Sequence, residues 1–121
     1  MKYLILIFGN PRSRAIWEHF SGEQRSAGYA AYAALDESLR ESGELIVSEA
    51  LTDPALAQRL PARVDLGPTD GPFAEAKEVI GGYALLKANS KAEVVELTRR
   101  FLNVTGEGSC EVHQLFEMPG A

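Results

Sequence analysis

Residues 79–86 read VIGGYALL and form an almost wholly apolar run, and this run decides the fold. A second run of the same kind, YLILIF at residues 3–8, ends at the turn residues Gly9-Asn10-Pro11. A strand with one face in water alternates apolar and polar side chains, whereas a strand covered on both faces does not. Both runs therefore predict strands whose two faces are buried.

Two helices are predicted outside these runs. Ser21 and Gln24 have the spacing of a capping box, and Gly43 is placed to end the helix that they open. Ser90 and Glu93 repeat the capping box before a second helix. A shorter segment, residues 13–20, also has helical spacing. The expected inward positions are Ala27, Ala31, Ala34, Leu35 and Leu39 in the first helix, and Ala92, Val95, Thr98 and Leu102 in the second.

Three further strands complete the pattern. Residues 45–47 and 110–116 are predicted strands, and residues 62–66 alternate as a half-exposed strand after an irregular, proline-containing link. This order predicts one α+β domain over residues 1–121, with a ferredoxin-like split βαβ sheet and an extra hairpin arm.

The two apolar runs also carry a prediction about assembly. Two helices can cover only one face of a four-stranded sheet, so another layer has to cover the second face. A second copy of the same sheet, stacked about 10 Å away, satisfies this requirement most simply. We therefore expect a homodimer formed by sheet-to-sheet packing.

Composition limits the possible partners and location. The 121 residues carry a net charge of -5, which argues against direct binding to nucleic acid, because phosphate binding needs clustered Lys and Arg. The apolar run at residues 3–8 is too short for a membrane span, and it is not followed by the small-residue cleavage site that a signal peptide requires. Cys110 is the single cysteine and cannot form an internal disulfide. A cytoplasmic protein without a membrane segment is expected.

The segment DGPFAE at residues 70–75, with Lys77-Glu78 and Gly81-Gly82-Tyr83, resembles the signature of the DGPF group of YCII-related proteins. The resemblance implies a ferredoxin-like fold that assembles as a dimeric α+β barrel. It implies no settled reaction, although relatives of the fold include muconolactone isomerases and cofactor-free monooxygenases. The wider family has a helix histidine where this chain has Tyr32, and tyrosine is a poor base at neutral pH. This difference argues against His–Asp dyad chemistry.

Five residues are candidates for a site. Asp70 is a candidate general base, or it caps its own turn as an Asx-turn. Phe73 either lines a cavity or anchors the loop, and Glu75 either faces Asp70 or is solvated. Tyr32 and Tyr83 either line the same cavity as ligand-binding residues or are ordinary core tyrosines.

No metal site or cofactor is expected. Cys110 and His113 are three residues apart on a predicted strand, so they point to opposite faces and cannot bind one ion together. The glycine pairs match neither a phosphate loop nor a complete dinucleotide fingerprint.

Three functions remain open from the sequence. The dimer could bind a small, partly apolar molecule in its barrel cavity. It could instead be a cofactor-free isomerase or lyase-like enzyme that uses Asp70 as a base. A protein-interaction module in a regulatory setting linked to sigma factors is the third alternative, which the resemblance suggests.

Overall fold

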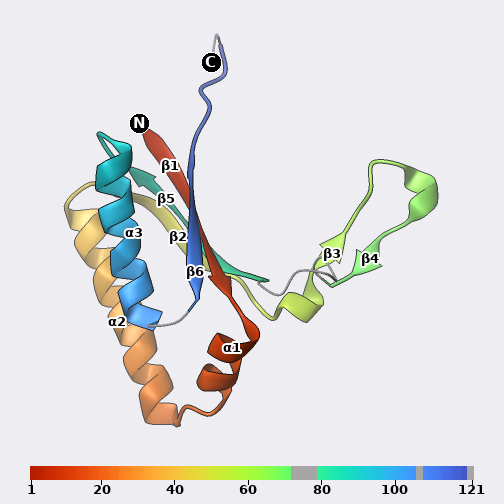
Figure 1. The fold of residues 1–121 in the computed structure, drawn as a ribbon, viewed down its shortest axis with the longest axis horizontal. Helices are drawn as coiled ribbons and strands as arrows, with labels where there is room; N and C mark the ends of the chain where they lie inside the picture. The colour runs from red at the N-terminus through yellow and green to blue at the C-terminus, as the bar shows by residue number, and fades with distance from the viewer. Residues whose placement is uncertain (72–78, 106–107, 120–121) are drawn as a thin grey trace.

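The chain folds into one antiparallel sheet with helices packed against it, as seen in a computed structural model that describes residues 1–71, 79–105 and 108–119 (Figure 1). The sheet has the order β2-β5-β1-β6. The two apolar runs form its central strands, β1 and β5. The strands are β1 (Lys2–Gly9), β2 (Leu45–Ala50), β5 (Val79–Lys87) and β6 (Ser109–Gln114), and the helices are α1 (Pro11–Glu18), α2 (Gly22–Glu41) and α3 (Lys91–Thr105).

Two βαβ units interlock in this sheet. β1, α2 and β2 form the first unit, and β5, α3 and β6 form the second. Since β1 and β5 lie side by side in the centre, each unit is split by a strand of the other. The predicted ferredoxin-like arrangement is confirmed.

Both long helices begin at the predicted capping residues, and the capping box of α2 is complete. The backbone N–H of Gln24 donates to the Ser21 hydroxyl (3.2 Å), and the Ser21 N–H donates to the Gln24 side chain (2.8 Å). At α3 the N–H of Glu93 donates to the Ser90 hydroxyl (3.2 Å), and the Glu93 carboxylate accepts from the N–H of Asn89 (2.9 Å), one residue before the expected Ser90. Gly43 has a φ of 81°, and this left-handed conformation terminates α2 as predicted.

The short helix α1 is joined to α2 by aromatic packing. The Trp17 and Tyr29 rings meet edge to face with centroids 5.3 Å apart. Gly28 allows this approach, because a Cβ atom there would lie 3.2 Å from the Trp17 ring. The Arg25 side chain donates to the main-chain oxygens of Trp17 and Glu18 and so caps the C-terminal end of α1.

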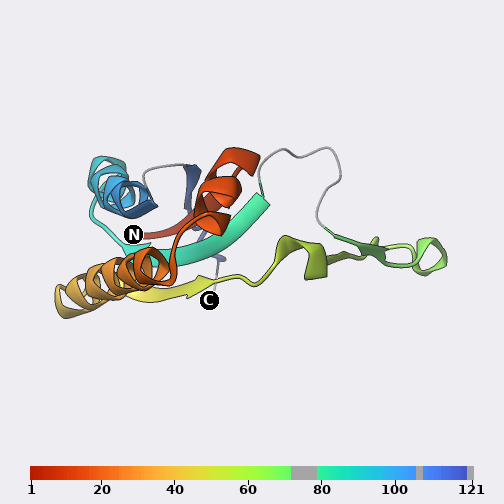
Figure 2. The same ribbon diagram turned by 90° about the horizontal axis from the view of Figure 1, so that it is seen from below.

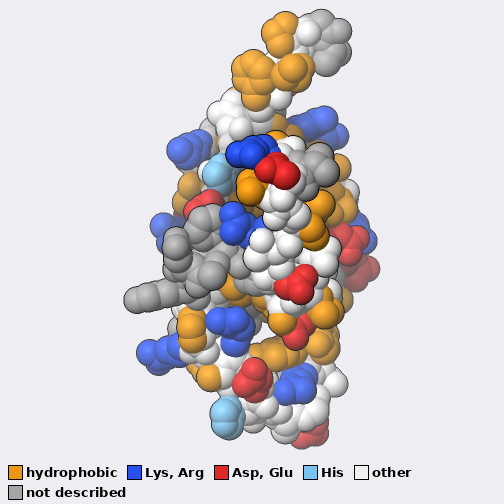
Figure 3. Space-filling model, turned by 90° about the vertical axis from the view of Figure 1, so that its right-hand side faces the viewer, with side chains coloured by type: hydrophobic (Ala, Val, Ile, Leu, Met, Phe, Trp, Pro, Cys, Tyr) orange, Lys and Arg blue, Asp and Glu red, His pale blue; other side chains and the backbone are white. Residues whose placement is uncertain are grey.

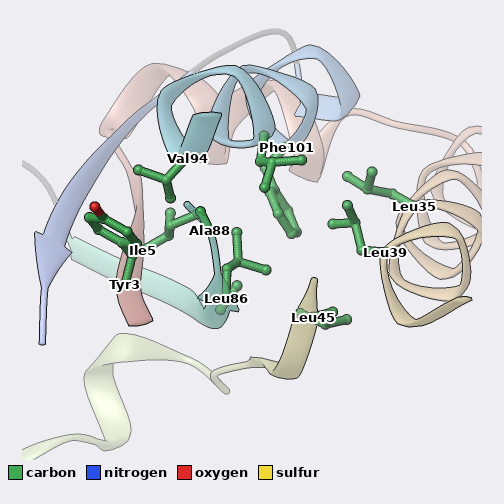
Figure 4. Close-up of a cluster of buried hydrophobic side chains, with 11 residues drawn as sticks. Tyr3, Ile5, Leu35, Leu39, Leu45, Leu86, Ala88, Val94 and Phe101 are labelled. Carbon is green, nitrogen blue, oxygen red and sulfur yellow. The ribbon is translucent and has the colours of Figure 1, made fainter. Parts of the chain in front are cut away.

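The hydrophobic core lies between the sheet and the helices α2 and α3 (Figure 4). Leu35 and Leu39 of α2 are buried in it, whereas Ala27, Ala31 and Ala34 are exposed. The predicted alanine part of the inward stripe is therefore wrong. Rotating the helix to bury leucine removes more apolar area from water than burying alanine does. The core consists of Tyr3, Ile5, Leu35, Leu39, Leu45, Ala84, Leu86, Ala88, Val94, Leu97 and Phe101.

The second face of the sheet lies on the side away from α2 and α3 (Figures 1 and 2). Leu4 and Leu6 alternate along β1 with the buried residues Tyr3 and Ile5, so they point to this second face. Their neighbours on β5 are Leu85 and Tyr83. We call this surface the open face.

A hairpin arm, residues 51–71, leaves the end of β2. Its strands, β3 (Gln58–Arg59) and β4 (Thr69–Asp70), pair with each other, and two 3-10 turns, η1 (Pro54–Leu56) and η2 (Val64–Leu66), complete it. The extra hairpin arm is thus present, but the predicted strand at residues 62–66 is wrong. Arg63 donates to both carboxylate oxygens of Asp65 (3.2 and 2.6 Å), which favours a local turn over an extended chain. None of the other described strands lies alongside this segment to pair with it.

Candidate functional site

The centre of the open face is apolar. Leu6 lies in the middle of it, in register with Tyr83 on one side and Glu111 on the other. Figure 3 looks at the molecule from the side of the arm and shows hydrophobic side chains among scattered charged ones. The apolar and aromatic side chains of the open face are Leu4, Leu6, Phe8, Val47, Ile80, Tyr83 and Leu85.

Tyr83 places a hydroxyl group on this apolar surface. Its cross-strand neighbours are Leu6 of β1 and Glu49 of β2. Directly opposite residues in an antiparallel pair have Cβ atoms about 4.5–5.5 Å apart, so a phenol and a carboxylate lie side by side here. The pair can offer a hydrogen-bond donor and an acceptor to a polar group of a ligand.

A second polar pair lies on the edge strand β6. The imidazole Nε2 of His113 is 2.9 Å from the Glu111 carboxylate, and both side chains are exposed. His113 is in register with Leu4, and Glu111 with Leu6, so both belong to the open face. Sequence reasoning missed this pair, although residues two apart on a strand point to the same face.

Tyr32 lies on the other side of the sheet from Tyr83. Its ring packs against the hydrophobic core from α2. Tyr83, by contrast, alternates with the buried Ala84 and faces away from the helices. One chain therefore does not bring the two tyrosines together.

Asp70 lies on the arm, in strand β4. Its carboxylate is exposed and accepts a hydrogen bond from the side chain of Gln58 (3.1 Å). The main chain beside it is fixed by the bond from the Gly71 N–H to the Ala57 oxygen. Phe73 and Glu75, the other two candidates near this turn, lie outside the described residues.

Two surface hollows lie near the start of β1, away from these candidates. The larger, of about 600 Å³, is lined by described residues that include Lys2, Glu44 and Lys87. The smaller one is lined by Met1, Lys2 and the C-terminal segment 114–117. Neither hollow includes Tyr32, Asp70 or Tyr83. We take the open face as the candidate ligand surface of one chain, because Tyr83 lies on it.

The metal-binding residue types and the single cysteine are the remaining reactive groups of the described residues. Within residues 1–71, 79–105 and 108–119, no three His, Cys, Asp or Glu side chains are grouped to hold a metal ion. Cys110 points to the core side of β6, opposite Ile7, and burial raises the pKa of its thiol. A raised pKa leaves little thiolate at neutral pH, so Cys110 is a weak nucleophile. None of the helices in the described part of the chain has the length and apolar content needed to cross a membrane.

Comparisons with known proteins agree with this architecture. The model of the YCII-related domain family matches residues 1–119. No curated protein matches the sequence significantly. Among solved structures, the chain is similar to 5-chloro-2-hydroxyhydroquinone dehydrochlorinase (TftG) from Burkholderia phenoliruptrix AC1100, in complex with 2,5-dihydroxybenzoquinone. The sequence identity is 19%, over 98% of this chain and 96% of that one, and the TM-score is 0.56, which shows a common fold.

Proposed function

Since this chain belongs to the YCII-related family, we propose that it works as a face-to-face homodimer that binds a small, partly apolar molecule between its two sheets. The observation that carries the proposal is the open face. Its centre is apolar, its edge strands carry Glu49, Glu111 and His113, and α2 and α3 both pack on the opposite side.

A second copy is the partner that suits this surface best. Two antiparallel sheets pack face to face at about 10 Å, which is the spacing of a dimeric α+β barrel. A twofold axis lets the same patch cover itself, with apolar centres in contact and polar edges at the rim. Burial of the apolar side chains contributes about 25 cal/mol for each Å² removed from water.

The polar groups of the open face suggest the class of ligand. Leu6 and Leu85 offer apolar contact to a flat ring, and Tyr83 with Glu49 offers hydrogen bonds to a hydroxyl or carbonyl group on that ring. The TftG structure holds 2,5-dihydroxybenzoquinone, a ring compound of this type. We therefore choose hydroxylated benzoquinones and related hydroxylated rings as the first ligands to test.

Removing the Tyr83 hydroxyl is expected to weaken ligand binding. In the Tyr83→Phe variant, one neutral hydrogen bond is lost, which corresponds to about a threefold to tenfold weaker Kd. Titration calorimetry of the dimer with 2,5-dihydroxybenzoquinone measures the change. Tyr29→Phe is the matched control, because Tyr29 is exposed on α2, away from the open face. Equal effects of the two substitutions, or no binding of any ring compound, would contradict the proposal.

A second candidate is a cofactor-free lyase-like or isomerase-like enzyme with Asp70 as its general base. The observation that favours it is the similarity in fold to a dehydrochlorinase over nearly the whole chain. Asp70 itself is exposed and thus accessible to a bound molecule.

The Asp70→Asn variant separates the two candidates. If Asp70 is the base, turnover should fall by about 10²–10⁴-fold while the fold and ligand affinity are kept, since asparagine can still accept the bond from Gln58. Turnover of the ring compounds that bind is followed by absorbance. Asp65→Asn removes a carboxylate elsewhere on the arm and is the control. If Asp70→Asn prevents folding or dimerisation, Asp70 has a structural role instead.

A further inference from the structure

The arm exposes several large apolar side chains, of which Leu51 lies at its start (49% exposed) and three lie further out. Leu56, Leu60 and Leu66 are 70%, 76% and 61% exposed, respectively. They are spread over the length of the arm, from η1 to η2. Single exposed leucines are ordinary, but several on one small projecting element indicate a contact surface.

The arm is attached to the sheet at its start, where the Leu51 N–H donates to the Gly81 oxygen (2.8 Å), but the hairpin beyond it is short. Each of its strands has two residues, and a lone two-stranded hairpin is marginally stable in water. The side-chain bonds from Gln58 to Asp70 at the base and from Arg63 to Asp65 near the tip are exposed to solvent. Exposed bonds of this kind contribute little to stability, so an apolar contact with a second copy would add to what holds the outer part of the arm.

The position of the arm indicates where that contact lies. In Figures 1 and 2 the arm projects away from α2 and α3, on the side of the sheet from which these helices are absent. A second sheet stacked on the open face would lie on this same side. The arm is long enough to extend beyond its own sheet, and it is continuous with the edge strand β2.

We propose that the arm of each chain clasps the second copy of the chain, with Leu56, Leu60 and Leu66 packed against it. The proposal rests on the proposed dimer and adds a distinct contact to it. A twofold axis supplies two arms, so that the apolar surface of both is covered without a third protein. The arms then form side walls of the space between the two sheets.

The first test replaces the three leucines together. The Leu56→Ser/Leu60→Ser/Leu66→Ser variant keeps every residue of the core and of the open face. Its dimer dissociation constant, measured by sedimentation equilibrium, is expected to be at least tenfold higher than that of the unmodified protein. Ala30→Ser/Ala31→Ser/Ala34→Ser, on the exposed side of α2, is the matched control and should leave this constant unchanged.

The second test follows trypsin cleavage after Arg63, on the exposed part of the arm. At a protein concentration that favours the dimer, cleavage should be at least tenfold slower than at a concentration that favours the monomer. Mass spectrometry of the fragments identifies the cut, and the three-leucine variant should lose this protection.

The outcomes separate the arm contact from the dimer itself. If the three substitutions change neither the dimer dissociation constant nor the rate of cleavage after Arg63, the arm contact is overturned. The face-to-face dimer would remain supported in that case. A protein that stays monomeric at every concentration would overturn both. A contact with an unrelated protein would show as leucine-dependent binding to that protein by a monomer, and it would also overturn the proposal.

Discussion

Replacing Leu6 with glutamate is expected to leave a folded monomer. Leu6 lies in the middle of the open face, between Tyr83 and Glu111, and it is not part of the core. In a face-to-face dimer the new carboxylate would be buried without a partner, close to its symmetry mate. An unpaired buried charge costs about 3–5 kcal/mol, and the dimer contains two of them, so dimerisation should weaken by at least about a thousandfold.

Light scattering after size-exclusion chromatography measures the mass of the variant, and circular dichroism measures whether it is folded. The Ala33→Glu variant adds the same charge to the exposed surface of α2 and should keep the mass of the unmodified protein. If Leu6→Glu remains dimeric, the interface lies on another surface and the open face is not its centre.

Truncating Phe101 to alanine is expected to cause a large loss of stability. Phe101 is 1% exposed and packs from α3 into the core between Leu39 and Leu86 (Figure 4). A phenylalanine-to-alanine change in a packed core costs about 3–5 kcal/mol, from lost transfer free energy and from the cavity left behind. That is a large part of the roughly 5–15 kcal/mol by which domains are stable.

Urea unfolding at fixed protein concentration, followed by Trp17 fluorescence, gives the free energy of unfolding of each variant. Phe116→Ala removes the same side chain from a position that is 79% exposed, so a change within about 0.5 kcal/mol is expected. Similar losses for the two variants would show that the core is not centred where α3 crosses the sheet.

The central elements could be predicted because their sequence signals act locally. The hydrogen bonds that cap α2 at Ser21 and α3 at Ser90 join residues three positions apart, and Gly43 sets its own backbone conformation. The runs at residues 3–8 and 79–86 predicted two strands that are apolar on both faces, and they form the centre of the sheet.

Two predictions were wrong because tertiary contacts determine the rotation of α2 and the conformation of residues 62–66. Ala27 and Leu35 both fit an apolar stripe, but the rotation of α2 is set by which side chains fill the core, and leucine fills more space. Apolar and charged side chains alternate over residues 62–66, as in a half-exposed strand. A strand needs a neighbouring strand to pair with, and the Arg63–Asp65 ion pair supports a turn instead.

The site was less predictable than the fold because it depends on which face each residue occupies. Tyr32 and Tyr83 are both partly buried tyrosines, and only the structure shows that the sheet separates them. The His113–Glu111 pair becomes visible once the register of β6 against β1 is known. Asp70 was singled out from its turn motif, and its distance from the sheet follows from the path of the arm (Figure 1).

The central claim is that a second copy covers the open face, and the mass of the unmodified protein in solution tests it most directly. Sedimentation equilibrium over a range of micromolar concentrations should give twice the 13.2 kDa of one chain. A mass of 13.2 kDa throughout that range would contradict the claim.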